Sequence, residues 1–188
     1  DHAGIGDRCS QLYIPTDQSM HVFETLMAAG TEFGLKLCGL HAMDSCRIEK
    51  GFRHFGHDIT EEDHVLEAGL GFAVKTAKPD FIGRDAVLRK KDAGLSARIG
   101  QFRLTDPEPL LYHAEPILRD GELVGYLTSG NYGHTLGGAV GLGYVPCGGE
   151  DAKSVLASSY EIEIAGTRVK AEASLKPMYD PTGARTKV

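Results

Sequence analysis

One stretch of the sequence concentrates the side chains that could bind a ligand. Cys46 to Gly51 (CRIEKG) runs directly into Phe52 to Ile59 (FRHFGHDI), and together they carry three cations, the carboxylate of Glu49, two aromatic rings and two histidines. A carboxylate accepts hydrogen bonds from the N–H and NH2 groups of a flat, nitrogen-rich ring, while aromatic side chains cover the ring face. The same pattern is also typical of a helix that ends at a glycine and continues into a basic loop. Both interpretations are open from these residues alone.

Histidine and cysteine are frequent metal ligands, and neither is spaced for that role here. Among the eight histidines, His54 and His57 lie three apart and His64 follows, but no H-E-x-x-H or comparable pattern occurs. The four cysteines form no C-x-x-C pair, which argues against a zinc knuckle or a redox pair and favours reduced thiols. We therefore expect no bound catalytic metal and a cytoplasmic location.

Charge and hydrophobicity argue against two further classes of partner. The net charge is −6, whereas nucleic-acid binding requires a basic face. No apolar run approaches the roughly 18 residues of a transmembrane helix. We expect neither a nucleic acid nor a membrane as a partner. The 24 glycines, a high number for this length, indicate many turns and a β-rich portion.

Hydrophobic spacing in the first half of the chain predicts helices and short strands. Residues 11–14 form a strand candidate that a proline ends. A helix that begins at residue 16 or 17 is predicted to end at a glycine, residue 30, and the helical spacing of Met20, Phe23 and Met27 predicts a face packed into a core. Three more elements are predicted: a helix over 40–49, an apolar strand over 66–75 and a helix over 84–93.

Glu49 lies at the C-terminal end of the predicted 40–49 helix. The negative end of the helix dipole disfavours a carboxylate at this place. The unfavourable placement favours a role toward a binding partner. The alternative is an ion pair within the chain, with Arg47 or Arg53.

The second half of the chain has the pattern of an antiparallel β structure. Asp120-Gly121 and Ala165-Gly166 are two-residue hairpin signals between apolar runs. The glycine-rich stretch Gly130–Gly138 lacks the lysine of a phosphate-binding loop, so we predict that it forms barrel turns. A small antiparallel barrel or a Greek-key sandwich follows from strands predicted over 98–104, 115–119, 123–128, 140–145, 160–164 and 168–175.

The run RIEKGFRHFGHDI, residues 47–59, resembles the R-[LI]-E-[KA]-G-[YF]-x-x-[YWF]-G-x-[DE]-[IM] signature of the aminomethyltransferase family. That family includes the T-protein of the glycine cleavage system and the C-terminal halves of sarcosine and dimethylglycine dehydrogenases. The segment EKGFRHFGHDIT is more similar to the dehydrogenase branch than to free-standing T-proteins. Other segments resemble the family in the right order: 11–15, 66–72, 81–86, 125–130 and 176–181.

The resemblance implies an α+β fold in two parts. Residues 1–95 would be the distal half of a folate-binding α+β domain, and residues 98–188 would be a C-terminal antiparallel β-barrel. The chain begins at Asp1 without an initiator methionine or a signal peptide, so we expect a fragment of a longer protein. The missing N-terminal half would then be a partner of this chain.

The resemblance also implies roles for individual residues. Glu49 would hydrogen-bond the pterin ring of tetrahydrofolate, Tyr179 would be a neighbour of the cofactor, and Lys75 would meet its glutamate tail or simply be a solvated surface cation. The aspartate that assists the cofactor's N5 belongs to the half that precedes this chain, so no catalytic residue is expected here. Asp44 and Asp58 do not match its motif. Glu49→Ala is expected to weaken folate binding and leave the fold intact.

The function that the resemblance implies is folate-dependent one-carbon transfer from a small N-methylated amino acid. FAD would be present only in a further N-terminal domain, as in sarcosine or dimethylglycine dehydrogenase. Three alternatives are open: a free-standing glycine cleavage T-protein, a non-catalytic folate-binding scaffold, and a methyltransferase that acts on a sulfonium substrate.

Overall fold

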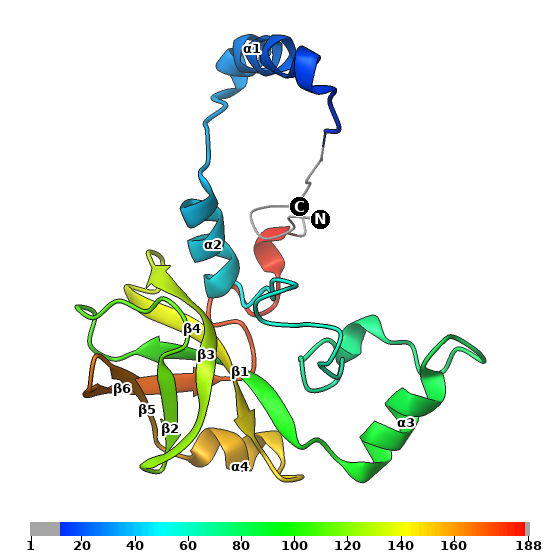
Figure 1. The fold of residues 1–188 in the computed structure, drawn as a ribbon, viewed down its shortest axis with the longest axis vertical. Coiled ribbons are helices and arrows are strands. Elements are labelled where there is room, and N and C mark those ends of the chain that lie inside the picture. Colours follow the sequence, from blue (N-terminus) through cyan, green and yellow to red (C-terminus); the bar gives the residue numbers. More distant parts are fainter. Residues whose placement is uncertain (1–11, 187–188) are drawn as a thin grey trace.

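The second half of the chain closes into a six-stranded antiparallel barrel (Figure 1). The computed structural model describes residues 12–186. The strand order around the barrel is β1-β4-β3-β2-β5-β6. The strands are β1 (Ala97–Leu104), β2 (Pro116–Arg119), β3 (Glu122–Gly133), β4 (Gly138–Pro146), β5 (Tyr160–Ile164) and β6 (Thr167–Ser174). The predicted antiparallel barrel is confirmed.

Two tight turns set the register of the hairpins at the places that the sequence predicts. Asp120 and Gly121 join β2 to β3 with φ values of 53° and 89°. Ala165 and Gly166 join β5 to β6 with φ values of 48° and 82°. Positive φ at both central residues is the geometry whose twist matches that of the flanking strands.

The glycine-rich stretch is mostly strand, which corrects the prediction that Gly130–Gly138 forms turns. β3 continues to Gly133, β4 begins at Gly138, and only residues 134–137 turn the chain. Glycine is needed here because other parts of the chain approach closely: a Cβ at Gly130 would lie 2.7 Å from Leu111 Cβ and 2.8 Å from the Tyr112 backbone nitrogen. The glycines therefore serve packing within the barrel wall.

The barrel interior forms the main hydrophobic core. Phe102 packs against Tyr160, with ring centroids 5.3 Å apart. The short helix α4 (Ala152–Ala157), which the sequence did not predict, adds Val155 to this core. Other buried members of the core are Leu104, Leu111, Ile117, Leu127, Ala139, Val145, Cys147 and Ile162.

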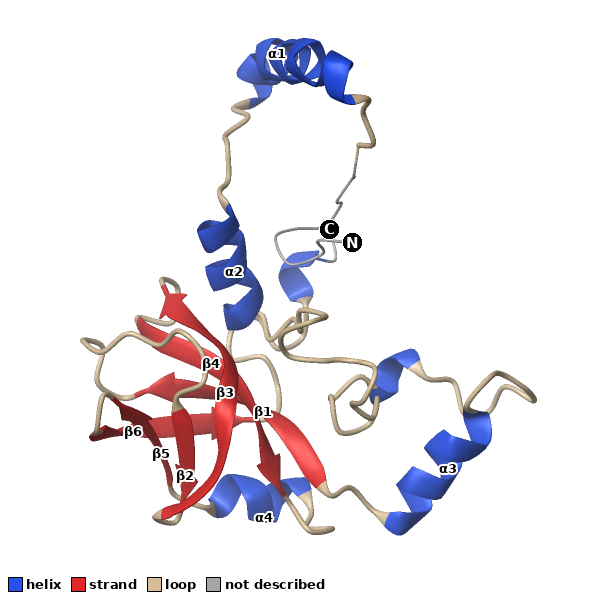
Figure 2. Cartoon of the chain, viewed as in Figure 1, coloured by secondary structure: helices blue, strands red, loops and turns tan. Residues whose placement is uncertain are grey.

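The helices of the first half lie outside the barrel (Figure 2). They are α1 (Ser19–Gly30), which the 3-10 turn η1 (Thr16–Gln18) precedes, α2 (Leu40–Glu49) and α3 (Arg84–Ala93). All three confirm predicted helices. α2 lies against β3 and β4, whereas α1 and α3 extend away from the barrel.

Three details of the predicted first half are wrong. The face of α1 that contains Met20 and Phe23 is not a core face: these side chains are 65% and 47% exposed, and α1 buries none of its residues against the described part of the chain. Gly30 has the right-handed φ of −78°, and the left-handed residue is Gly34. Residues 12–14 pair with no strand of the described chain, and residue 11 lies outside the described residues.

The predicted strand over 66–75 is also wrong, because the chain turns here. The N–H groups of Ala68 and Leu70 donate to the carbonyls of His64 and Val65, and a 3-10 turn, η3 (Gly71–Ala73), follows. Gly69 has a φ of 68°, which interrupts an extended chain. Alternating hydrophobicity indicated a strand, but the positive φ of a glycine decides the local fold.

Glu67 ties this turn to the start of the barrel. Its Oε1 accepts hydrogen bonds from the N–H groups of Ser96 (2.7 Å) and Ala97 (3.1 Å) and from the Ser96 hydroxyl, and lies 2.8 Å from Lys90 Nζ. Burial raises the pKa of Glu67, but the hydrogen bonds from Lys90, Ser96 and Ala97 outweigh burial and lower the pKa to about 2.

This lowered pKa predicts an acid-dependent loss of stability. The stabilisation is complete above the unfolded-state pKa, about 4.3, and is lost as the pH falls toward the folded-state pKa of about 2. We expect Glu67→Gln to lower stability near neutral pH and to remove this part of the acid dependence. Denaturant unfolding of both proteins between about pH 7 and about pH 2 measures the difference. Curves that stay parallel over this range would contradict the assignment.

Candidate functional site

A large open cavity lies where α2 meets the barrel. Its volume is about 1470 Å³. Five parts of the chain line it: α2, the segment 50–59, the turn 69–72, the loop 110–113 and strand β3, with residues 175–177 and 181 at the edge. The segment that the sequence singled out for its chemistry is therefore one wall of this cavity.

α2 is fixed on the barrel by polar contacts at Ser45 and at its C-terminal end. Ser45 Oγ donates to the Tyr132 carbonyl oxygen at 2.6 Å. At the end of the helix, Gln101 of β1 donates to the carbonyl oxygens of Ile48 (2.6 Å) and Glu49 (3.0 Å). The helix C-terminus, whose carbonyls lack helical partners, is thus satisfied by the barrel.

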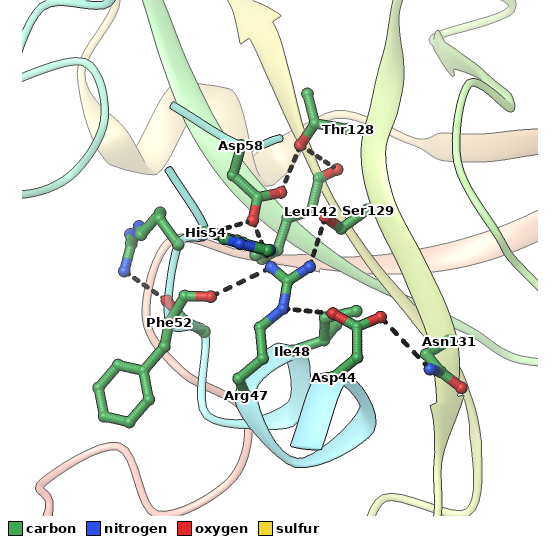
Figure 3. A network of polar contacts seen from close by, with 12 residues as sticks. Asp44, Arg47, Ile48, Phe52, His54, Asp58, Thr128, Ser129, Asn131 and Leu142 are labelled. Carbon is green, nitrogen blue, oxygen red and sulfur yellow. Dashed lines mark hydrogen bonds and ion pairs between the residues drawn. The ribbon is translucent and has the colours of Figure 1, made fainter. Parts of the chain in front are cut away.

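Arg47 is the centre of a buried polar network between α2, the following segment and β3 (Figure 3). Its Nε donates to Asp44 Oδ1 at 2.7 Å, its Nη2 donates to Ser129 Oγ at 2.7 Å, and its Nη1 forms an ion pair with Asp58. Nη1 also donates to the Phe52 carbonyl oxygen at 3.3 Å. A buried guanidinium with two carboxylates and two further acceptors is fully compensated.

Asp58 completes this network from the other side. Its side chain is fully buried. Besides the pair with Arg47, it accepts hydrogen bonds from the His54 N–H at 2.9 Å and from Thr128 Oγ1 at 2.6 Å. These contacts fold residues 52–58 back onto β3 and hold the loop that carries His54, Phe55 and His57 at the cavity.

The carboxylate of Glu49 does not face the cavity. It is 4% exposed, and its Oε1 accepts from the N–H groups of Thr135 (2.7 Å) and Leu136 (2.9 Å) in the β3–β4 turn. Glu49 is not among the residues that line the cavity. The alternative ion pair with Arg47 or Arg53 is not formed either, since Arg47 pairs with Asp44 and Asp58. Both backbone hydrogen bonds go to Oε1, so this oxygen supports the β3–β4 turn.

The other two predicted contact residues also lie away from the cavity lining. Tyr179 is half-buried, its N–H donates to the Glu49 carbonyl oxygen at 3.3 Å, and the Arg185 guanidinium lies over its ring at 5.7 Å. Lys75 is exposed and is not part of the lining. The structure thus places Glu49 and Tyr179 side by side behind the wall of the cavity, and Lys75 elsewhere.

The cavity itself presents aromatic rings, histidines and one accessible carboxylate. Phe55 is 66% exposed, and His54 and His57 face each other with ring centroids 4.6 Å apart. Asp44 lines the cavity, and its Oδ2 lies 3.4 Å from Asn131 Nδ2. Such a set of flat faces, one acceptor and one amide fits a planar, nitrogen-rich ligand.

Sequence reasoning missed Asp44 and Asn131 as cavity residues. Asp44 lies three residues before Arg47 on the same helix. This spacing predicts that the two side chains lie on the same face of the helix and contact each other. No local signal identifies Asn131, because it reaches the site only through the pairing of β3 with β4.

Burial perturbs two ionisable groups, Arg53 in the cavity lining and Tyr144 outside it. Burial lowers the pKa of Arg53, although Asp58 and Tyr144 oppose this effect. Burial likewise raises the pKa of Tyr144, whose hydroxyl has no hydrogen-bond partner in the described structure. Ionisable groups with perturbed pKa values in a hollow are more common at functional sites than elsewhere on a protein surface.

Neither a membrane-spanning helix nor a metal cluster occurs among residues 12–186. None of the described helices has both the length and the hydrophobicity needed to span a membrane. Within the same residues, no group of three or more histidine, cysteine, aspartate or glutamate side chains is placed to hold a metal ion.

Two family models cover most of the chain. Residues 5–78 match the GCVT N-terminal domain, and residues 98–180 match the glycine cleavage T-protein C-terminal barrel domain. The second range spans the six-stranded barrel apart from Ala97, and its description names a barrel.

Two enzymes and one solved structure are similar to the chain over most of its length. The chain is 40% identical to 4-methylaminobutanoate oxidase (formaldehyde-forming) of Paenarthrobacter nicotinovorans, over 96% of this chain and 22% of that protein. It is 35% identical to human mitochondrial sarcosine dehydrogenase, over 97% of this chain and 20% of that protein. A crystal structure of the glycine cleavage system aminomethyltransferase T from Bartonella henselae superposes with a TM-score of 0.74 at 25% identity, over 89% of this chain and 45% of that one. The chain thus spans about a fifth of the two enzymes and under half of the third protein.

Proposed function

Because the chain belongs to the glycine cleavage T-protein (aminomethyltransferase) family, we propose that it binds tetrahydrofolate in the cavity between α2 and β3. There it would take part in passing a one-carbon unit to the folate. One observation carries this proposal: the family-like signature at residues 47–59 forms a wall of a cavity with aromatic, carboxylate and amide groups.

The residues of the chain supply binding and orientation. Phe52 and Phe55 offer faces for a flat ring, and Asp44 and Asn131 offer an acceptor and a donor for its edge. The Arg47–Asp58 network keeps this wall in place. Tetrahydrofolate, when bound, supplies a nucleophilic amine that captures the carbon. No described residue of the chain is assigned a catalytic role.

We propose further that the complete protein acts on a small N-methylated amino acid, with FAD in a separate domain. Support comes from relatives that are named as an oxidase of 4-methylaminobutanoate and as sarcosine dehydrogenases. Incubation of the full-length protein with N-methylglycine, with and without tetrahydrofolate, tests this. We expect methylenetetrahydrofolate to form in place of free formaldehyde when folate is present. Equal formaldehyde release in both reactions would contradict folate-dependent transfer.

Phe55→Ala tests the cavity directly. An aromatic contact contributes about 0.5–1.5 kcal/mol beyond area burial, so we expect tetrahydrofolate to bind about 2- to 10-fold more weakly. The measurement is an equilibrium titration of the full-length protein. Phe33→Ala is the matched control, because Phe33 is also an exposed phenylalanine but lies outside the cavity. If both variants bind as the unmodified protein does, the ring is not held at this wall.

A further inference from the structure

The cations that line the cavity differ in how their charge is compensated. Arg47 has Asp44 and Asp58, and Lys50 Nζ lies 2.7 Å from Asp180 Oδ2 and donates to the Asp180 carbonyl oxygen at 2.6 Å. Arg53 and Lys176 also line the cavity, yet neither forms an ion pair with any carboxylate of residues 12–186.

Arg53 is the more unusual of the two, because it is half-buried. Its Nη1 donates to the Gly51 carbonyl oxygen at 2.6 Å, but its Nε is buried and has no hydrogen-bond partner in the described structure. Its Nη2 packs on the backbone of Gly69, where a Cβ would lie 2.6 Å away. A guanidinium that is partly removed from water without an ion pair is costly, and burial accordingly lowers the pKa of Arg53 against the opposing charge of Asp58.

Arg53 and Lys176 lie at one corner of the cavity. Both also line a second, very small hollow of about 10 Å³ beside the main cavity, together with Gly51 and Pro177. Two cations from segments more than a hundred residues apart in the sequence thus line the same two hollows. No acidic side chain lines the small hollow.

We propose that Arg53, assisted by Lys176, binds a carboxylate group of the ligand that occupies the cavity. The planar fork of a guanidinium donates N–H groups to both oxygens of a carboxylate, and the ammonium group adds a point charge. A bound carboxylate would also supply the counter-ion that the protein itself does not provide. The inference rests on the proposed function, since tetrahydrofolate, through its glutamate tail, and an N-methylated amino acid both carry this group.

Equilibrium titrations of the full-length protein and its Arg53→Gln variant distinguish the two sources. One arm compares tetrahydrofolate with tetrahydropteroate, which lacks the glutamate. The other arm compares N-methylglycine with N-methylglycinamide, which lacks the carboxylate. Loss of a charge-assisted contact is expected to weaken binding about 10- to 100-fold, and only for the carboxylate-bearing member of one pair.

Three further variants keep the test decisive. Lys176→Gln alters an exposed side chain that no core contact depends on, and we expect a smaller weakening of the same ligand, about 2- to 5-fold. Arg53→Lys keeps the charge without the fork and should recover part of the affinity. Arg168→Gln is the control, because this exposed arginine on β6 lies outside the cavity.

The outcomes distinguish failure of the carboxylate site from failure of the proposed function. If tetrahydrofolate binds the unmodified protein and neither Arg53→Gln nor Lys176→Gln weakens any ligand, the carboxylate site is overturned and the proposed function stands. If tetrahydrofolate does not bind the unmodified protein, the proposed function fails, and the N-methylglycine arm alone decides the role of Arg53. A protein that binds neither probe overturns both.

A stability measurement separates binding from a structural role. Since Arg53 is half-buried and forms no ion pair within residues 12–186, the ligand-free Arg53→Gln protein is expected to unfold at the same temperature as the unmodified protein or a higher one. A purely structural arginine would give a lower temperature. A lowered midpoint together with unchanged ligand affinity would therefore overturn the carboxylate site.

Discussion

Asp58→Ala is expected to lower the free energy of unfolding by about 3–5 kcal/mol. The change leaves the Arg47 guanidinium buried with one of its two carboxylates gone, and it removes the acceptor for the His54 N–H and the Thr128 hydroxyl. Breaking a buried pair from one side is costly because the remaining charge stays out of water. Denaturant unfolding of the chain, followed by circular dichroism, measures the loss.

The same variant should also loosen the cavity. Residues 52–58 are held on β3 through Asp58, so tetrahydrofolate affinity should fall together with stability in the full-length protein. Asp85→Ala is the control, because Asp85 is an exposed aspartate whose arginine neighbour lies at 3.8 Å. We expect it to change stability by less than about 0.5 kcal/mol. An Asp58 variant as stable as this control would contradict the network's role.

Glu49→Ala is expected to cost about 2–4 kcal/mol of stability. The change removes the acceptor of the Thr135 and Leu136 N–H groups, and a hydrogen bond to a charged group contributes about 1.5–3 kcal/mol, less where water can replace the acceptor, as at the exposed Thr135. This differs from the expectation that the substitution leaves the fold intact, which assumed a carboxylate reserved for a ligand. Thermal and denaturant unfolding of the chain measure the effect.

A conservative variant separates support of the turn from ligand contact. Glu49→Gln keeps a carbonyl oxygen that can accept from the same two N–H groups, so most of the stability should return. Glu163→Ala is the matched control, since Glu163 lies on the barrel surface and its arginine neighbour is at 3.9 Å. Should Glu49→Ala weaken tetrahydrofolate binding in the full-length protein at unchanged stability, Glu49 would be a ligand contact and the structural role would be refuted.

The barrel could be predicted from the sequence because its signals are local. Asp120-Gly121 and Ala165-Gly166 each set a hairpin between apolar runs, and positive φ at both turn residues confirms them. The helix over 40–49 was likewise visible from its spacing and its bounds were correct. These elements depend on residues only a few positions apart.

The candidate site was harder to predict because its contacts join distant parts of the chain. Glu49 meets the turn at Thr135 and Leu136, 86 and 87 residues away, and helix-dipole reasoning about Glu49 cannot reveal those partners. The apolar face of α1 shows the same limit. Its helical spacing predicts a buried face, but within the described residues no surface covers Met20 or Phe23.

The span of these contacts has a consequence for biogenesis. The hydrogen bonds that seat α2 and the 50–59 segment bridge 70 residues between Asp58 and Thr128, 82 between Arg47 and Ser129, and 87 between Ser45 and Tyr132. Closing such long loops is slow, and they gain nothing until the distant strand exists. During translation, α2 and the 50–59 segment therefore leave the ribosome well before β3, the strand that supports them. This wall of the cavity can take its final structure only after the barrel has folded. Substitutions in the barrel core that slow or prevent folding should therefore also disturb the cavity, although they do not contact it.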